Sequence, residues 1–323
     1  MTHHCLSRRQ LLITAGAAAG IAVTGVPSFA GAGGKNAGIA EPKRTVSFRY
    51  CFNTGTIRGQ KLGVVKEIEI VARAGYDSIE LWIDGINNYI KSGGTLKELR
   101  NRIADLGLTL EDAIGFAPWI VDDDTERAKG LEQAKRDMDM LAQIGGKRIA
   151  APPVGATEKE GLDLGRIAER YRTLLELGSK TGIVPQLEIW GASKNISRLS
   201  QAAFVVIESG HPKACLLADV YHIYKGGSDF NGLKMLSAEA IQVFHLNDYP
   251  AEPPREKIND RDRIYPGDGV APLAQILRNL HANGGQTILS LELFNPNYYK
   301  QDPLEVAKTG LGKMKAAVEK AVA

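Results

Sequence analysis

The chain has 323 residues, of which 44% are hydrophobic and 24% charged, as in ordinary soluble globular proteins. Its net charge is +3, and two of these charges come from Arg8 and Arg9. Neither nucleic acid nor an anionic membrane surface is therefore expected as the main partner. Length alone allows one large domain or two ordinary ones, so the pattern along the chain must decide.

The first thirty residues are typical of an export signal. A twin-arginine pair in "SRRQLL" (7–12) leads into "LLITAGAAAGIAV", an apolar run too short and too rich in Gly and Ala to anchor stably in a bilayer. "SFA" (28–30) offers a small-x-Ala cleavage site. We predict a Tat-type signal over residues 1–30, a flexible linker over 31–44, and a periplasmic or extracellular protein. An uncleaved membrane tether is the alternative.

From residue 45 onward, short apolar or β-branched runs alternate with longer segments of helical spacing. Glycine often stands just before a run, as in "ARAGYDSI" and "QIGGKRI", where a helix would end in a left-handed cap. Eight strand-then-helix units over residues 45–323 predict a (β/α)8 TIM barrel, with a doubly wound open sheet as the alternative. The predicted strands are 45–52, 76–82, 108–116, 147–153, 184–190, 213–219, 241–248 and 287–294.

Four consecutive predicted strands end in side chains that can bind a metal. The carboxyl ends of barrel strands form the active site, so these side chains are expected to meet. Three carboxylates would repel one another unless a divalent cation neutralised them, and oxygen donors with one imidazole suit Mn2+, Mg2+, Co2+ or Zn2+. We expect Mn2+; each residue taken alone could instead form a salt bridge at the rim. The predicted ligands are Glu188, Asp219, His245 and Glu292.

Two further kinds of side chain are predicted to contact substrate. His222 lies one turn beyond Asp219 and is expected to bind substrate hydroxyls or to support a metal ligand, with a capped loop histidine as the alternative. Trp82, Trp119 and Trp190 all fall at or just after predicted strand ends. Indole packs on the apolar C–H faces of a sugar or polyol, which indicates a carbohydrate substrate. Each tryptophan alone could simply close the top of the barrel.

The strand-end motifs also resemble a known superfamily. "LEIW", "LADVYH", "FHLND", "RIYPGDGV" and "LSLELF" resemble the xylose-isomerase-like sugar isomerases and epimerases over nearly all of residues 45–310. The resemblance implies that Glu188 and Glu292 bind one metal and flank the substrate on opposite faces. It assigns Asp219 and His245 to the metal and His222 to the substrate.

The resemblance further implies that Arg263, in "RIYPGDG", contacts the far end of the substrate. Two departures from the family pattern bear on this end of the pocket. Tyr265 stands where the family usually has an acid, and a longer charged loop precedes Arg263. We therefore expect a reshaped pocket and do not infer a phosphorylated substrate.

Together these features predict a metal-dependent isomerase or epimerase that acts on a keto-sugar or related polyol through an enediolate. Glu188 and Glu292 would move the proton, and the metal would stabilise the charge that develops. A keto-sugar dehydratase or lyase shares the first proton transfer and is the alternative enzyme. A non-catalytic exported carbohydrate-binding barrel is the alternative outside catalysis. Abasic-site endonucleases need more metal-binding histidines and a more basic surface, and the number of subunits stays open.

Overall fold

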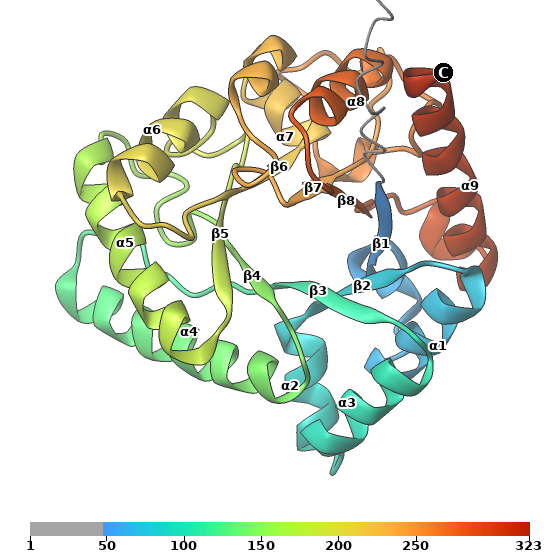
Figure 1. Cartoon of the computed structure of the whole chain (residues 1–323), viewed down its shortest axis with the longest axis horizontal. Coiled ribbons are helices and arrows are strands. Elements are labelled where there is room, and N and C mark those ends of the chain that lie inside the picture. The colour runs from blue at the N-terminus through green and yellow to red at the C-terminus, as the bar shows by residue number, and fades with distance from the viewer. Residues whose placement is uncertain (1–47) are drawn as a thin grey trace, which may run out of the picture. The chain divides into compact units, whose positions relative to one another are not determined.

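The computed structural model describes residues 48–323, and the predicted signal and linker lie outside this range. Eight parallel strands form a nearly closed barrel with helices around it (Figure 1), which confirms the predicted (β/α)8 fold. The strand order is β3-β2-β1-β8-β7-β6-β5-β4. The strands are β1 (Arg49–Asn53), β2 (Ser78–Trp82), β3 (Thr109–Ile114), β4 (Arg148–Ala151), β5 (Val184–Glu188), β6 (Leu216–Asp219), β7 (Val243–His245) and β8 (Ile288–Leu291).

The helices connect successive strands and bury one apolar face against the barrel. Several end at a glycine in the left-handed region, where a Cβ atom would be strained, as at Gly75 (φ 89°) and Gly182 (φ 79°). The α-helices are α1 (Val64–Ala74), α2 (Ile83–Lys91), α3 (Leu96–Asp105), α4 (Asp124–Gln143), α5 (Leu164–Thr181), α6 (Leu199–Ser209), α7 (Val220–Lys225), α8 (Leu273–Ala282) and α9 (Pro303–Val322). Short 3-10 helices are η1 (Thr54–Gln60), η2 (Phe230–Met235), η3 (Asp260–Asp262) and η4 (Tyr298–Lys300).

The barrel closes between β3 and β4 through side chains. These two strands end the hydrogen-bonded order, and the structure gives no backbone ladder between them within residues 48–323. Arg148 on β4 instead donates to the carboxylate of Glu111 on β3 at 3.0 Å. Glu111 is buried and also pairs with Arg49 (2.6 Å) and Lys147 (3.0 Å). This cluster lies near the amino-terminal ends of β1 and β4, where TIM barrels place residues that serve stability.

Strand register brings the predicted metal ligands together. Asp219 pairs in register with His245, and His245 pairs in register with Ser290. Side chains alternate along a strand, so Glu292, two residues after Ser290, lies on the same side as Ser290. The ends of β6, β7 and β8 therefore present three of the predicted ligands side by side.

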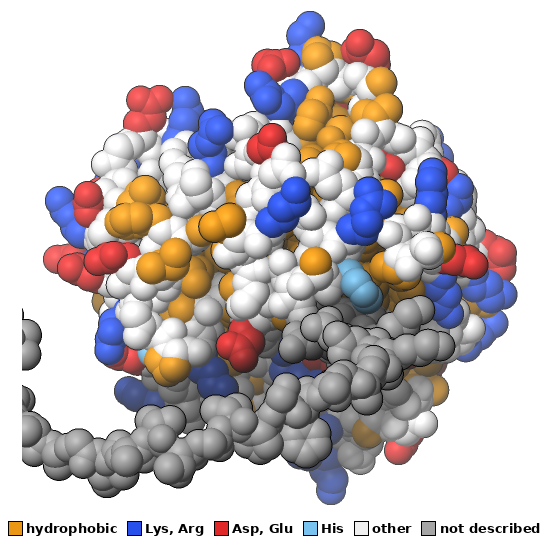
Figure 2. Space-filling model, turned by 45° about the horizontal axis from the view of Figure 1, so that its top comes forward, with side chains coloured by type: hydrophobic (Ala, Val, Ile, Leu, Met, Phe, Trp, Pro, Cys, Tyr) orange, Lys and Arg blue, Asp and Glu red, His pale blue; other side chains and the backbone are white. Residues whose placement is uncertain are grey.

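The surface carries charges of both signs. Figure 2 shows one face on which Lys and Arg side chains are interspersed with Asp and Glu, without a large field of one sign. This face carries no basic patch of the kind expected for nucleic acid. None of the helices within residues 48–323 has the length and apolar character needed to cross a bilayer.

Candidate active site

Asp219, His245 and Glu292 form a buried set of metal donors. One donor atom of each lies within 4.8 Å of the other two. His245 Nδ1 lies 3.1 Å from Glu292 Oε2 and 3.6 Å from Asp219 Oδ2, yet this buried nitrogen makes no hydrogen bond. Buried polar atoms normally have a partner, so an unpaired imidazole nitrogen facing two carboxylates fits a ligand of a divalent cation.

Glu80 holds the His245 ring in the orientation that a metal ligand needs. His245 Nε2 lies 3.0 and 3.1 Å from the two carboxylate oxygens of Glu80, and Ser290 donates to Glu80 at 2.6 Å. A carboxylate can only accept, so Nε2 carries the hydrogen and Nδ1 faces the other carboxylates. Burial lowers the pKa of His245, but Glu292 and Glu80 outweigh it and hold the pKa well above its usual value. A cation would replace the Nδ1 proton.

Asp219 is the last residue of β6, and its two carboxylate oxygens have different partners. Oδ1 accepts from the backbone N–H of His222 at 2.8 Å and so caps α7. Oδ2 accepts from Asn247 and Arg263, each at 3.0 Å. Burial would raise the pKa of Asp219, but Arg263 and His245 outweigh it and keep the pKa below its usual range. Asp219 is therefore an ionised carboxylate at the floor of the site.

Arg263 lies against the metal donors and lines the same cavity as Glu292, and its contact with the far end of the substrate stays a prediction. It is 1% exposed, and Nη1 donates to Asp219 Oδ2 (3.0 Å) and Glu292 Oε2 (2.7 Å). Nη2 donates to Asp260 (2.6 Å) and lies 3.0 Å from His222 Nε2. A backbone bridge explains the position of Arg263. Residues 248 and 264 form two backbone hydrogen bonds with each other, which fix the segment that carries Arg263 beside the end of β7.

The pKa values of Glu292 and Glu188 are shifted in opposite directions. Glu292 Oε1 accepts from Asn53 Nδ2 at 2.9 Å, and the Asn53 amide is oriented because its oxygen accepts from Trp82 Nε1 and the Gly55 N–H, each at 2.8 Å. Burial raises the pKa of Glu292, but His245 and Arg263 outweigh it, so the pKa is lowered. Glu188 Oε2 is buried without a hydrogen bond, and burial followed by Glu292 raises the pKa of Glu188 to about 8. Such a pair can serve as base and acid.

Glu188 lies outside the three-residue donor set. It lines the same cavity as Glu292, whose charge contributes to raising the pKa of Glu188. Its assignment as a fourth metal ligand stays a prediction.

A cavity of about 410 Å³ lies above these groups. Its polar lining includes Glu188, His222, Arg263 and Glu292, while Asp219 and His245 are completely buried beneath. Aromatic side chains in contact with one another form one wall of the cavity. The ring centroids are separated by 5.5 Å between Trp82 and Phe116, 6.2 Å between Phe116 and Trp190, and 6.0 Å between Trp82 and Phe294. The cavity is therefore suited to a ligand with both hydroxyls and an apolar face.

Trp119 is the one predicted tryptophan that does not line this cavity. Its side chain is 1% exposed, donates from Nε1 to the carbonyl of Pro152 at 2.9 Å and packs on Tyr171. The buried indole N–H needs an acceptor, and the loop after β4 supplies one within the core. Trp119 thus closes the barrel rather than contacting substrate.

Several residues of the site were not predicted from the sequence: Asn53, Glu80, Phe116, Asn247, Asp260, Ser290 and Phe294. Two of them stand out in the sequence itself. Glu80 is a carboxylate inside the apolar run "SIELW", and Asn53 ends the first strand, as Asp219 ends the sixth.

The chain is similar to known enzymes. Residues 68–317 match the family model described as xylose isomerase-like TIM barrel. The inosose isomerase of Bacillus velezensis is 27% identical over 279 residues, covering 84% of this chain and 98% of that protein. The 3-dehydro-D-guloside 4-epimerase of Escherichia coli is 24% identical over 266 residues, covering 77% and 92%. The crystal structure of the IOLI protein with a bound zinc atom has a TM-score of 0.79 at 23% identity, covering 85% and 100%. The relatives belong to the predicted isomerase and epimerase classes.

Proposed function

Because the chain belongs to the xylose isomerase-like TIM barrel family, we propose that it is a metal-dependent isomerase or epimerase of a keto-sugar or related polyol. The observation that carries this proposal is the unpaired His245 Nδ1 facing Asp219 and Glu292 at the floor of an aromatic-walled cavity. A divalent cation bound there would supply Lewis-acid stabilisation of the enediolate, an effect of several kcal/mol.

The protein's own residues move the proton. Glu292, whose pKa is lowered by His245 and Arg263 and which accepts a hydrogen bond from Asn53, removes the proton from the carbon next to the carbonyl. Glu188, whose raised pKa of about 8 favours the protonated form at neutral pH, delivers a proton to the intermediate. Delivery to the opposite face of the same carbon gives epimerisation, and delivery to the neighbouring carbon gives isomerisation. His222 and Arg263 bind substrate oxygens.

Proton exchange with solvent tests this function. The protein with Mn2+ is incubated in D2O with a panel of ketoses and oxidised glycosides, and exchange of the substrate C–H for deuterium is followed by NMR. We expect exchange with at least one compound, and its loss in Glu188→Gln and Glu292→Gln. Glu176→Gln is the matched control, because Glu176 pairs with Arg172 on the exposed face of α5. Full exchange in either site variant contradicts the two-glutamate mechanism, and a dehydrated product points to the dehydratase.

The identity of the metal belongs to the same proposal. Two carboxylates and one imidazole, or three carboxylates if Glu188 joins them, favour Mn2+, whereas the zinc in the IOLI structure makes Zn2+ the main competitor. Elemental analysis of protein purified without chelators distinguishes them.

We also propose that the protein is exported through the Tat route, on the strength of "SRRQLL" and the following apolar run. Amino-terminal sequencing of the mature protein tests this, and an intact Met1 would contradict signal cleavage.

A further inference from the structure

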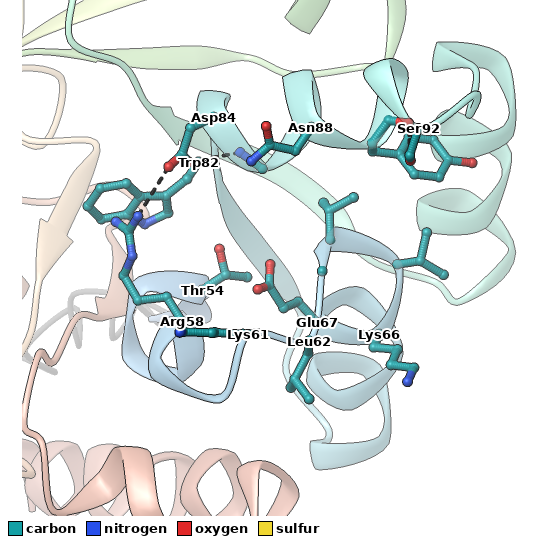
Figure 3. Close-up of a pocket in the computed structure, with 15 residues that line it drawn as sticks. Thr54, Arg58, Lys61, Leu62, Lys66, Glu67, Trp82, Asp84, Asn88 and Ser92 are labelled. Atoms are coloured by element: carbon teal, nitrogen blue, oxygen red, sulfur yellow. Dashed lines mark hydrogen bonds and ion pairs between the residues drawn. The ribbon is translucent and has the colours of Figure 1, made fainter.

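A second cavity lies beside the catalytic one, and the mechanism above does not use it. It has a volume of about 610 Å³ and lies between η1, the start of α1, and α2 (Figure 3). Because η1 follows β1 and α2 follows β2, it shares the carboxyl-terminal end of the barrel with the active site. Trp82 lines both cavities.

The side chains of Glu67 and Asn88 line this second cavity and have no hydrogen-bond partner among the described residues, whereas the nearby Thr54 hydroxyl donates to the carbonyl of Glu80 at 3.2 Å. In Figure 3 the Glu67 carboxylate points up from α1 with Thr54 beside it, and the Asn88 amide comes from α2 on the opposite wall. No hydrogen bond to the side chain of Glu67 or Asn88 occurs within the described part of the chain. Burial, ahead of the effect of Asp84, raises the pKa of Glu67 to about 7. These groups are therefore available to a ligand.

The wall shared with the catalytic cavity is a neutral ion pair stacked on an indole. The Arg58 guanidinium carbon lies 4.0 Å from the Trp82 ring centroid, and Nη2 donates to Asp84 at 3.1 Å. A guanidinium has five N–H donors, so most of those on Arg58 remain free. The charged side chains of the lining are Arg58, Lys61 and Lys66 against Glu67 and Asp84, so a phosphate group would meet two carboxylates and an ammonium group three cations. Hydroxyl groups both donate and accept, so they match this mixed and nearly neutral set.

We propose that the second cavity binds a hydroxyl-rich ring attached to the reacting sugar, so that the substrate is a glycoside or oligosaccharide with more than one ring. This inference rests on the proposed function. The reacting ring occupies the 410 Å³ catalytic cavity, and the attached ring lies beyond Trp82 against Arg58, Glu67 and Asn88. Because Trp82 Nε1 donates to Asn53, which donates to Glu292, a ring packed against the Arg58–Trp82 wall also holds the catalytic carboxylate in place.

Equilibrium binding of two unreactive probes, methyl β-cellobioside and methyl β-glucoside, tests this proposal by calorimetry on the metal-loaded protein. We expect the two-ring probe to bind more tightly. Glu67→Ala and Asn88→Ala should each weaken its binding about tenfold, the loss of roughly one or two hydrogen bonds, and change binding of the one-ring probe less than twofold. Glu69→Ala is the matched control, because Glu69 is on the same helix but pairs with Arg102. Melting temperatures confirm that each variant is folded.

Equal effects on both probes, or no preference of the wild-type protein for two rings, would overturn the inference. The measurement needs no turnover. A protein that binds as expected but exchanges no proton therefore refutes the proposed reaction alone, and one that exchanges protons but lacks the two-ring preference refutes the second cavity alone.

Discussion

Replacing Arg263 by methionine tests the electrostatics of the site most directly. Arg263 is 1% exposed and is within 3.0 Å of Asp219 and 2.7 Å of Glu292. Met keeps an apolar stem and removes the charge, so that of the two basic neighbours of these buried carboxylates only His245 remains. Breaking a buried ion pair in this way costs about 3–5 kcal/mol. At roughly 2–4 °C of melting temperature for each kcal/mol in a chain of this size class, the metal-free variant should melt roughly 6–20 °C below the wild type.

The assay is differential scanning calorimetry in EDTA and again with excess Mn2+. A bound cation neutralises the same carboxylates, so Mn2+ should raise the melting temperature of Arg263→Met more than that of the wild type. Arg102→Met is the control, since Arg102 and Glu69 form an exposed pair worth about 0–1 kcal/mol. If Arg263→Met and Arg102→Met melt within 2 °C of each other in EDTA, the reasoning about the buried cluster is refuted.

Three further predictions concern single contacts. Asn53→Leu removes the hydrogen bond from Asn53 to the charged carboxylate of Glu292, which is worth about 1.5–3 kcal/mol. The kcat for proton exchange should therefore fall roughly 10- to 150-fold. An unchanged kcat would contradict the role of Asn53 in holding Glu292. Glu80→Gln should weaken Mn2+ binding about 10- to 100-fold in calorimetric titration, because it loosens the hydrogen bond that orients His245. Glu67 has a folded-state pKa of about 7, above its unfolded value, so its contribution to stability is present below about pH 4.5 and is lost as the pH rises through 7. Melting curves from pH 4 to 9 should show a smaller loss of stability with rising pH in Glu67→Gln than in the wild type and Glu69→Gln, because Glu188, with a pKa raised to about 8, still titrates in all three.

The strands could be predicted because buried segments are apolar in sequence, and their carboxyl ends because an ionisable residue follows the apolar run. An apolar run that stops at an acid, as at Asp219, has few structural solutions, and register between neighbouring strands then follows from the fold. The same logic would have found Glu80, whose carboxylate interrupts an otherwise apolar strand.

Loop residues could not be placed in this way. The position of Arg263 depends on the backbone bridge between residues 248 and 264, and that of Trp119 on a carbonyl supplied by Pro152, thirty-three residues away. Neither contact follows a period of 2 or 3.6, so no spacing in the sequence indicates which way these side chains point. The second cavity was missed for the same reason, since Arg58 and Asn88 come from separate segments that only the tertiary fold brings together.

The side-chain closure between β3 and β4 determines where the barrel wall should open locally. Elsewhere around the barrel, separating two neighbouring strands breaks a row of backbone hydrogen bonds, but here it breaks chiefly the pairing of Glu111 with Arg148 and side-chain packing. Loss of that contact leaves the other seven strand boundaries, each with its backbone ladder, intact. Local opening of the barrel wall should therefore begin between β3 and β4. Amide hydrogens of these two strands should exchange with solvent before those of β7 and β8.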